Sequence, residues 1–317
     1  MIVERFVVAI VSVCSSCSSG ATTATSTSSG SAPIANASTD NEPCQQLTFA
    51  DSTPVAEASG AAWWTIGGAL RLVVVGDSGN HGDYTVVDPE TGATLERGNL
   101  PLGDAPSDDL EGLASRDGKL YGLLAPGWML VWERHGDKFE LVDGAYPLGP
   151  VDLPDKGHGD KPPKTEGMVC PGKKNNCGRN YEGLCIPDRA HAAGPCAGFA
   201  AAKADGNLYC LIETETDGRF ALDKSMSLSI TRPGALADCA FSDDGTLLAA
   251  SNLFDASNVY RVDGWRDLKT AKVELIAAIG VGFPEVVAAR GDVVYRMSDT
   301  GVSPSLMTKF RCRALKR

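Results

Sequence analysis

Asp109–Leu124, with the sequence DLEGLASRDGKLYGLL, carries the clearest fold signal in this chain. An acidic start leads into an apolar run, Asp117 and Gly118 follow, and a second apolar run completes the segment. Asp-Gly between two alternating apolar runs is the strongest short-range signal for a β-hairpin. The segment therefore predicts two antiparallel strands joined by a tight turn.

The same pattern recurs along the chain, and a second hairpin follows several of the copies. Val86–Glu96 and Met129–Gly144 are two such second hairpins. A unit of about four short strands that repeats every 40 to 50 residues is the blade of a β-propeller. The other copies are Ser59–Gly76, which is the weakest, Tyr181–Glu213, which contains an insertion, Leu236–Ser251 and Phe283–Ser298.

We therefore expect an all-β propeller of five or six four-stranded blades over residues 44–312. Five blades can be counted, and a sixth could lie around residues 165–170. Residues 150–180 are rich in Pro, Gly, Lys and Cys, and we expect an inserted loop there. Propellers often close by borrowing a strand from the other terminus, so Cys44 and the residues after it are expected to pair beside Met307–Cys312.

Eight cysteines lie beyond the N-terminal region, and an even number in an exported chain implies disulfides. Spacing along the chain and position in the repeats suggest one pairing out of 105 possible ones. Four of these cysteines cluster between residues 170 and 196, which leaves zinc as an alternative, but they lack the CxxC spacing of structural zinc sites. The expected pairs are Cys170–Cys177, Cys185–Cys196, Cys210–Cys239 and Cys44–Cys312.

The N-terminus has the pattern of an export signal. Arg5 precedes an apolar run at residues 6–13, which is too short to span a bilayer. Small residues before Cys17 resemble the cleavage box of bacterial lipoproteins, although Cys14 stands where Leu is usual. Residues 1–17 are thus expected to be a signal peptide that leaves a lipidated Cys17. Cleavage at a later small residue, such as Gly20, is the alternative.

The segments that flank the expected propeller are a tether and a tail. Residues 18–43 are mostly Ser, Thr, Ala and Gly, a composition that cannot bury enough apolar surface to fold. Residues 313–317 form a short basic tail. Together with the lipid anchor, the tether predicts an outer-membrane lipoprotein in the bacterial cell envelope, with the membrane as a partner and an envelope protein as a further candidate partner.

The charge balance excludes one class of partner. The formal net charge is −11, and no stripe of Lys and Arg occurs that could neutralise phosphates. We therefore expect no nucleic-acid partner.

Several blade motifs resemble known families of secreted bacterial propellers. The VVVGDSGNHGDYTVVDPETG segment at residues 73–92 is similar to a blade of the NHL-type propellers, although Gly82 stands where those blades usually carry Arg. The segments DDLEGLA (108–114) and NYEGLCI (180–186) resemble strands of the SdiA-regulated and esterase-like phytase propellers. The likeness covers short blade motifs between residues 59 and 298, and it implies a propeller more strongly than it implies any activity.

Four acidic residues occupy similar points near the start of successive blades: Glu111, Glu182, Asp238 and Glu285. If the strand that starts there is the innermost one, these carboxylates meet at one mouth of the central channel. Converging carboxylates repel one another unless protons or a cation neutralise them, and calcium accepts six to eight oxygens in loose geometry. We therefore expect a calcium site, to which Glu166 could add a ligand. Acids that start strands and face solvent are the alternative.

A second candidate is the segment at residues 77–83, with Asp77, Ser78, Asn80, His81 and Asp83. These residue types are similar to those that hold calcium in lactonase-type propellers. The segment is also typical of an ordinary turn, in which Asp and Asn satisfy local backbone groups, and this reading is favoured.

Nucleophilic catalysis has little support in the sequence. There is no GxSxG motif, and paired cysteines leave no free thiol. Turns or loops hold the four histidines, which are His81, His135, His158 and His191.

Two hypotheses of function follow. The favoured one is a cell-envelope lipoprotein whose propeller acts as a binding or scaffold module with an unknown ligand. The alternative is a calcium-dependent hydrolase of the phytase-like phosphoesterase or lactonase-like kind.

Overall fold

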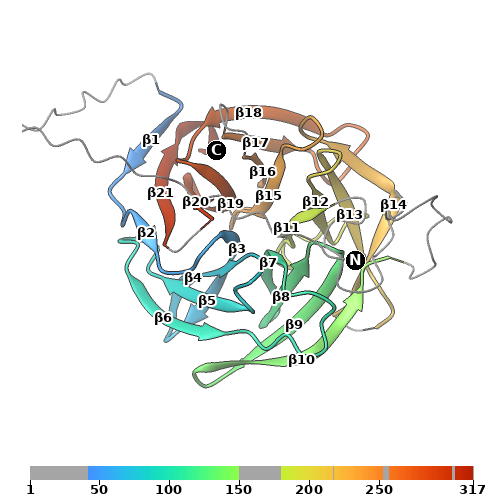
Figure 1. Ribbon diagram of the computed structural model, residues 1–317. Helices are drawn as coiled ribbons and strands as arrows, with labels where there is room; N and C mark the ends of the chain where they lie inside the picture. The colour runs from blue at the N-terminus through green and yellow to red at the C-terminus, as the bar shows by residue number, and fades with distance from the viewer. Residues whose placement is uncertain (1–41, 150–179, 217, 253–256, 302–303, 317) are drawn as a thin grey trace, which may run out of the picture. The chain divides into compact units, whose positions relative to one another are not determined.

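Five antiparallel sheets surround a common axis in the computed structural model, which describes residues 42–149, 180–216, 218–252, 257–301 and 304–316 (Figure 1). The first blade contains β3 (Ala58–Ile66), β4 (Ala69–Gly76), β5 (Asp83–Val87) and β6 (Thr94–Asn99). The second contains β7 (Leu110–Arg116), β8 (Lys119–Leu124), β9 (Trp128–His135) and β10 (Lys138–Pro147). The third contains β11 (Tyr181–Cys185), β12 (Gly198–Ala202), β13 (Asn207–Glu213) and β14 (Phe220–Ser229).

The last two blades complete the ring. The fourth contains β15 (Leu236–Phe241), β16 (Leu247–Ser251), β17 (Asn258–Asp263) and β18 (Lys272–Ala278). The fifth contains β19 (Phe283–Arg290), β20 (Val293–Asp299) and β21 (Ser305–Cys312), which β1 (Cys44–Leu47) and the short β2 (Ser52–Thr53) extend. A 3₁₀ turn at Arg313–Leu315 follows, and it buries Leu315 in the expected basic tail.

The hairpin predicted at Asp117–Gly118 is confirmed. Arg116 pairs with Lys119 across a two-residue turn, and Asp117 and Gly118 have φ angles of 54° and 74°. Positive φ at both central residues is the requirement of the type I′ turn, which matches the twist of the strands that it joins.

The hydrophobic core consists of five clusters, one between each pair of neighbouring blades. In β4, Val73 and Val75 pack toward the second blade, whereas Leu72 and Val74 pack toward the fifth. Alternate side chains of one strand therefore bury opposite faces of the blade. A blade with two apolar faces needs a neighbour on each side.

The ring closes as the sequence predicted. β1 pairs antiparallel with β21, Cys44 lies opposite Cys312, and a disulfide joins the two residues. The innermost strands β3, β7, β11, β15 and β19 contact one another in cyclic order, ending with β19 against β3. The propeller thus has five blades, and the sixth blade considered for residues 165–170 has no place in this closed ring.

Two of the predicted disulfides are wrong. Cys185 pairs with Cys239 rather than Cys196, because these two residues lie on the adjacent inner strands β11 and β15. Cys196 pairs with Cys210, because the chain enters β12 alongside β13 and brings these two residues within 5.2 Å between their Cα atoms. The prediction chose disulfide partners by their proximity along the chain. The true partners are those that the packing of strands within and between blades brings together.

Several predictions fall outside the described residues. These are the signal peptide, the lipidated Cys17, most of the tether, the inserted loop with Cys170–Cys177, and Glu166. In the part of the chain that the structure describes, no helix has the length and apolar character needed to cross a membrane.

The first testable prediction concerns the closing disulfide. Replacing Cys44 and Cys312 together by Ser should lower the free energy of unfolding by about 5 kcal/mol, since the bond closes a very long loop. The matched double variant of Cys196 and Cys210, whose bond spans 14 residues, should lose about 3 kcal/mol. Denaturant unfolding measures both values. A larger loss for the second variant, or a non-reduced peptide map with different pairs, would contradict the closure described.

Candidate cation site at the start of the inner strands

Each inner strand carries a β-bulge near its start. The register shifts at the second residue of β3, β7, β11 and β15 and at the third residue of β19, which are Ser59, Glu111, Glu182, Ala237 and Glu285. A bulged residue is left out of the ladder, which frees its side chain to point elsewhere. Three of the five residues carry carboxylates.

These three carboxylates, from Glu111, Glu182 and Glu285, come together. One oxygen of each lies within 4.8 Å of the other two, and all three side chains are buried. Lys203, from the turn between β12 and β13, donates hydrogen bonds to Glu182 at 2.8 Å and to Glu285 at 3.2 Å. An internal ammonium therefore neutralises part of this triad.

Two amides complete the partners of this half of the site. Asn252 donates to Glu285 at 2.7 Å, and Asn180 donates to Glu182. The carboxylates of Glu182 and Glu285 therefore both accept hydrogen bonds from donors of the third and fourth blades.

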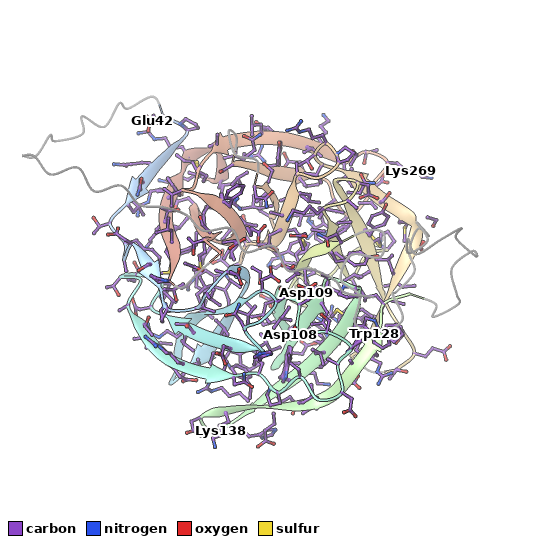
Figure 2. The ribbon with its side chains drawn as sticks, viewed as in Figure 1. Glu42, Asp108, Asp109, Trp128, Lys138 and Lys269 are labelled. Carbon is purple, nitrogen blue, oxygen red and sulfur yellow. A yellow bond between two sulfur atoms is a disulfide. The ribbon has the colours of Figure 1, made fainter. Side chains whose placement is uncertain are left out.

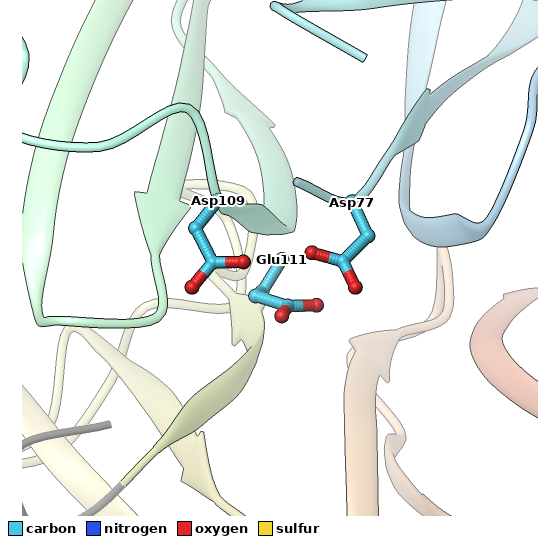
Figure 3. A group of neighbouring side chains, drawn as sticks. All are labelled: Asp77, Asp109 and Glu111. Carbon is cyan, nitrogen blue, oxygen red and sulfur yellow. The ribbon is translucent and has the colours of Figure 1, made fainter. Parts of the chain in front are cut away.

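A second triad shares Glu111 and adds Asp77 and Asp109, again with oxygens within 4.8 Å. Asp77 follows β4, and Asp109 directly precedes β7. Figure 2 shows Asp109 near the centre of the ring. Figure 3 shows Asp77 and Asp109 on either side of Glu111. The Glu111 side chain is only 6% exposed, and no described residue donates a hydrogen bond to its carboxylate. The oxygens of this triad are as close to one another as those of the first triad. Among the described residues, however, no side chain plays the part that Lys203 plays in the first triad.

Burial and like charge change the acidity of the cluster. Burial, followed by the hydrogen bond and the charge of Asp77, raises the pKa of Asp109 to about 8. Burial also raises the pKa of Glu182 to about 8, although Lys203 opposes this effect. The pKa of Glu111 lies well above its usual value because of burial and then because of Glu182. Without a cation, the cluster therefore retains protons near neutral pH.

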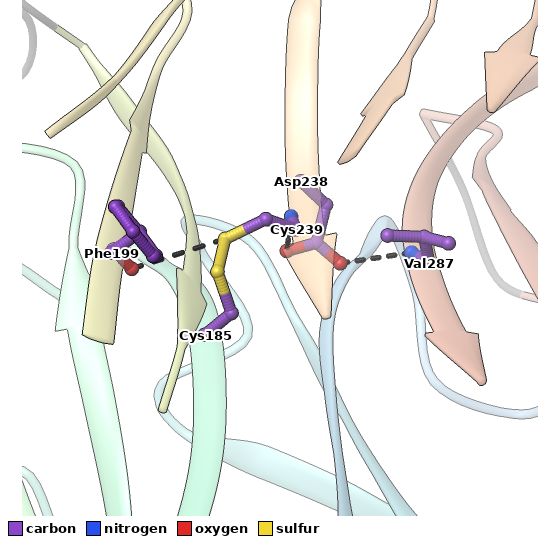
Figure 4. The surroundings of a disulfide bond; sticks show 5 residues. All are labelled: Cys185, Phe199, Asp238, Cys239 and Val287. Carbon is purple, nitrogen blue, oxygen red and sulfur yellow. Dashed lines mark hydrogen bonds between the residues drawn. A yellow bond between two sulfur atoms is a disulfide. The ribbon is translucent and has the colours of Figure 1, made fainter. Parts of the chain in front are cut away.

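Asp238 does not join the cluster, although the sequence placed it there. Ala237 occupies the bulge of β15, so Asp238 stands one residue further along than the three glutamates. Its carboxylate accepts hydrogen bonds from the backbone N–H groups of Cys239 at 2.7 Å and Val287 at 2.8 Å (Figure 4). Asp238 thus ties β15 to β19 within the wall of the channel.

The segment at residues 77–83 is largely an ordinary turn, but one of its residues belongs to the carboxylate cluster. The Asn80 side chain donates to the Asp77 carbonyl oxygen at 3.0 Å, and Asp83 accepts from Asn99, as in an ordinary turn. His81 lies 2.6 Å from Asp108, which holds this loop against the start of the second blade. Of these residues, the Asp77 carboxylate lies in the triad with Asp109 and Glu111.

Two residues of the site were missed by the sequence analysis. Asp109 stands two positions before Glu111 in the quoted DLEGL motif, where it was taken only as the start of a strand. Lys203 lies in a hairpin turn, and a single Lys in a turn gives no sequence signal of a buried partner.

Two glycines lie between the carboxylates and the later halves of the inner strands, and this level of the axis is called the neck here. A Cβ at Gly112 would lie 2.5 Å from the Leu184 nitrogen, and one at Gly183 would lie 2.4 Å from the Asp238 carboxylate. Neighbouring inner strands can approach this closely only because these positions carry Gly. A cavity of about 500 Å³ is lined by residues beyond this level, and none of the clustered carboxylates belongs to its lining.

The fold defines this chain as a five-bladed β-propeller, and comparisons with known proteins go no further. No protein-family model and no curated protein matches the sequence. The chain is similar to a solved glutaminyl cyclase from Myxococcus xanthus, at 13% identity and a TM-score of 0.48, over 85% of this chain and 97% of that one.

Two further solved structures show the same level of likeness. A luciferin-regenerating enzyme matches at 9% identity and a TM-score of 0.46, over 86% of this chain and 96% of that one. The Cps50 (Swd1) β-propeller domain of Myceliophteria thermophila matches at 12% identity and a TM-score of 0.40, over 80% and 83%. Likenesses of this size assign no activity to the chain.

The second testable prediction concerns stability and pH in the absence of divalent cations. The folded-state pKa values of Glu111, Glu182 and Asp109 exceed those of unfolded Glu and Asp. The folded state therefore binds more protons, and the free energy of unfolding should fall as pH rises from about 5 to 8. Glu111→Gln should reduce this fall, because the Gln side chain does not titrate.

Urea unfolding at several pH values in EDTA measures the effect. Glu140→Gln, an exposed glutamate on β10, is the matched control and should follow the wild type. A wild-type stability that stays constant or rises between pH 5 and 8 would contradict this electrostatic description.

Proposed function

We propose that this chain is an exported binding propeller that holds calcium with Asp77, Asp109 and Glu111. The observation that carries the proposal is the contrast between the two triads that share Glu111. Lys203 contacts the Glu182–Glu285 side, whereas the buried Glu111 carboxylate has no donor among the described residues. A bound cation supplies the missing positive charge.

Calcium fits the donor set better than other metals do. The triad offers carboxylate oxygens only, without His or Cys, which disfavours zinc and copper. Calcium tolerates irregular geometry and takes further oxygens from carbonyl groups and water, whereas magnesium demands a near-ideal octahedron.

The third testable prediction is a calorimetric titration of the full chain with calcium after removal of EDTA. We expect one calcium per chain with a dissociation constant of about 1 mM or lower, and a rise in melting temperature on binding. Glu111→Gln should weaken binding at least about tenfold, since it removes the carboxylate shared by both triads. Glu140→Gln should bind as the wild type does. Absence of both heat and thermal stabilisation at 10-fold higher calcium would overturn the proposal.

A calcium-dependent hydrolase is the second candidate, and the carboxylate triad at the channel mouth favours it. A cation held by Asp77, Asp109 and Glu111 would polarise the carbonyl group of a bound substrate. The excess of carboxylates suits a neutral ester or lactone better than a phosphate ester, because phosphate would be repelled.

The fourth testable prediction separates the two candidates. If the chain is a hydrolase, it should turn over nitrophenyl esters or lactones in calcium, lose activity in EDTA, and lose at least about 100-fold in Asp109→Asn. Calcium binding without turnover of esters, lactones or phosphate monoesters would leave the binding module as the function.

The disulfide bonds indicate the cellular compartment of the protein. The described part of the chain contains three disulfides, which indicate an oxidising environment outside the cytosol. We place the propeller in the cell envelope, with Cys17 as its lipid anchor to the outer membrane and with an envelope protein as a possible partner.

The fifth testable prediction concerns this anchor. Mass spectrometry of the mature N-terminal peptide should find Cys17 as the first residue with bound acyl chains, and Cys17→Ala should release the chain from membranes. An unmodified N-terminus at Gly20 or beyond would contradict the anchor while leaving the cation site untouched.

A further inference from the structure

The central channel contains a chamber of about 500 Å³ on the far side of the neck from the carboxylates. Its walls are the later halves of the five inner strands. Each strand contributes a small or aliphatic residue to the lining, and the side chains of these residues also pack between the blades: Ala61, Ala114, Leu184, Ala240 and Ala288. A volume of this size is typical of sites for small organic ligands.

The inner strands are linked to one another at the inner end of this chamber. Cys185 and Cys239 belong to its lining, and their disulfide joins β11 to β15 at this point. The adjacent Asp238 carboxylate bonds β15 to β19 through the Val287 N–H group. The exposed residues of the lining lie at the opposite end, where the inner hairpins turn, so we expect a ligand to enter there.

The walls also offer hydrogen-bonding groups. Each inner strand is the last strand of its sheet and pairs on one side only. On its other edge some backbone groups are bonded by neighbouring blades, as are the Val287 N–H and the Ala289 carbonyl oxygen, and the others face the axis. The chamber combines small apolar side chains with peptide edges.

The rim of the chamber is acidic. Three exposed acids lie there, each in the connection between the first two strands of a different blade: Asp117, Asp188 and Asp243. Arg290 approaches Asp243 at 3.8 Å, and Arg189 pairs with Asp117 at 2.6 Å. The Asp188 carboxylate has no partner among the described residues, so its charge remains available.

The remaining basic residue of the lining does not offset this charge. The Arg116 side chain is only 1% exposed, and its guanidinium donates to Glu213 at 2.6 Å. The same group lies over the Phe220 ring, between the second and third blades. With the Asp188 carboxylate at the rim and a net charge of −11, the field at the chamber favours positive ligands.

We infer that this chamber binds a small organic cation, a primary ammonium with an apolar body. The body lies against the alanines of the inner strands, and the ammonium lies at the rim beside Asp188. This second site is separated from the calcium site by the neck, and it does not depend on the function proposed above.

The test uses three probes of matched shape on the full chain: phenethylamine, phenethyl alcohol and 3-phenylpropionate. Calorimetry should show that the amine binds at least about tenfold more tightly than the alcohol, and that the carboxylate does not bind. Affinity for the amine should fall as salt is added, because the rim charges are exposed.

Variants of one exposed residue assign the site. Asp188→Asn should weaken amine binding about fivefold, and Asp188→Lys should abolish it. Asp137→Asn, an exposed acid in the turn between β9 and β10, should change nothing and is the matched control. Unchanged melting temperatures confirm that the variants fold.

The inference is overturned by equal affinity for amine and alcohol, by unchanged binding in both Asp188 variants, or by no binding of any probe at millimolar concentration. Amine binding that is the same in EDTA and in calcium supports two separate sites. If the calcium titration fails, amine binding that depends on Asp188 still supports this inference, so the two proposals stand or fall independently.

Discussion

Closure of the ring is the constraint on which the rest of this structure depends. Every blade has two apolar faces, so each needs a neighbour on both sides, and an open arc would expose the faces at its ends. The pairing of β1 with β21 and the Cys44–Cys312 disulfide hold the last blade in place. Once the ring is closed, the five inner strands are held side by side, with their starts gathered at one mouth of the channel.

This gathering explains why five carboxylates lie so close together. In an unfolded chain Asp77, Asp109, Glu111, Glu182 and Glu285 would be hydrated and far apart, and their approach costs free energy through repulsion and lost solvation. Packing between blades offsets this cost, and Lys203 neutralises one side of the cluster. The side without an internal cation is where an external one has most to contribute. Strain of this kind at one point of a stable scaffold is typical of functional sites.

The neck of glycines gives the axis two ends with different chemistry. Gly112 and Gly183 let neighbouring inner strands approach closely, and the Asp238 carboxylate lies against Gly183 at the same level. Buried carboxylates lie on one side of this level, and a chamber with an acidic, solvent-exposed rim lies on the other. A small ion and an organic ligand can therefore be bound separately by one ring of strands.

Local patterns in the sequence predicted the hairpins, the blades and the strand exchange that closes the ring. They also predicted that Glu111, Glu182 and Glu285 converge, because all three occupy the same point of a repeated unit. Hydrophobic alternation and turn chemistry are properties of neighbouring residues, so a linear reading recovers them.

The tertiary structure alone decided the contacts between blades. A bulge at Ala237 moved Asp238 one position away from the acids, and the ring paired Cys185 with Cys239 instead of the nearer Cys196. Asp77 joined Asp109 and Glu111, and Lys203 reached the cluster, through contacts between residues distant in the chain. One residue of register shift redirects a side chain, and no local pattern records which strands become neighbours, so these features arise only when the five blades pack together.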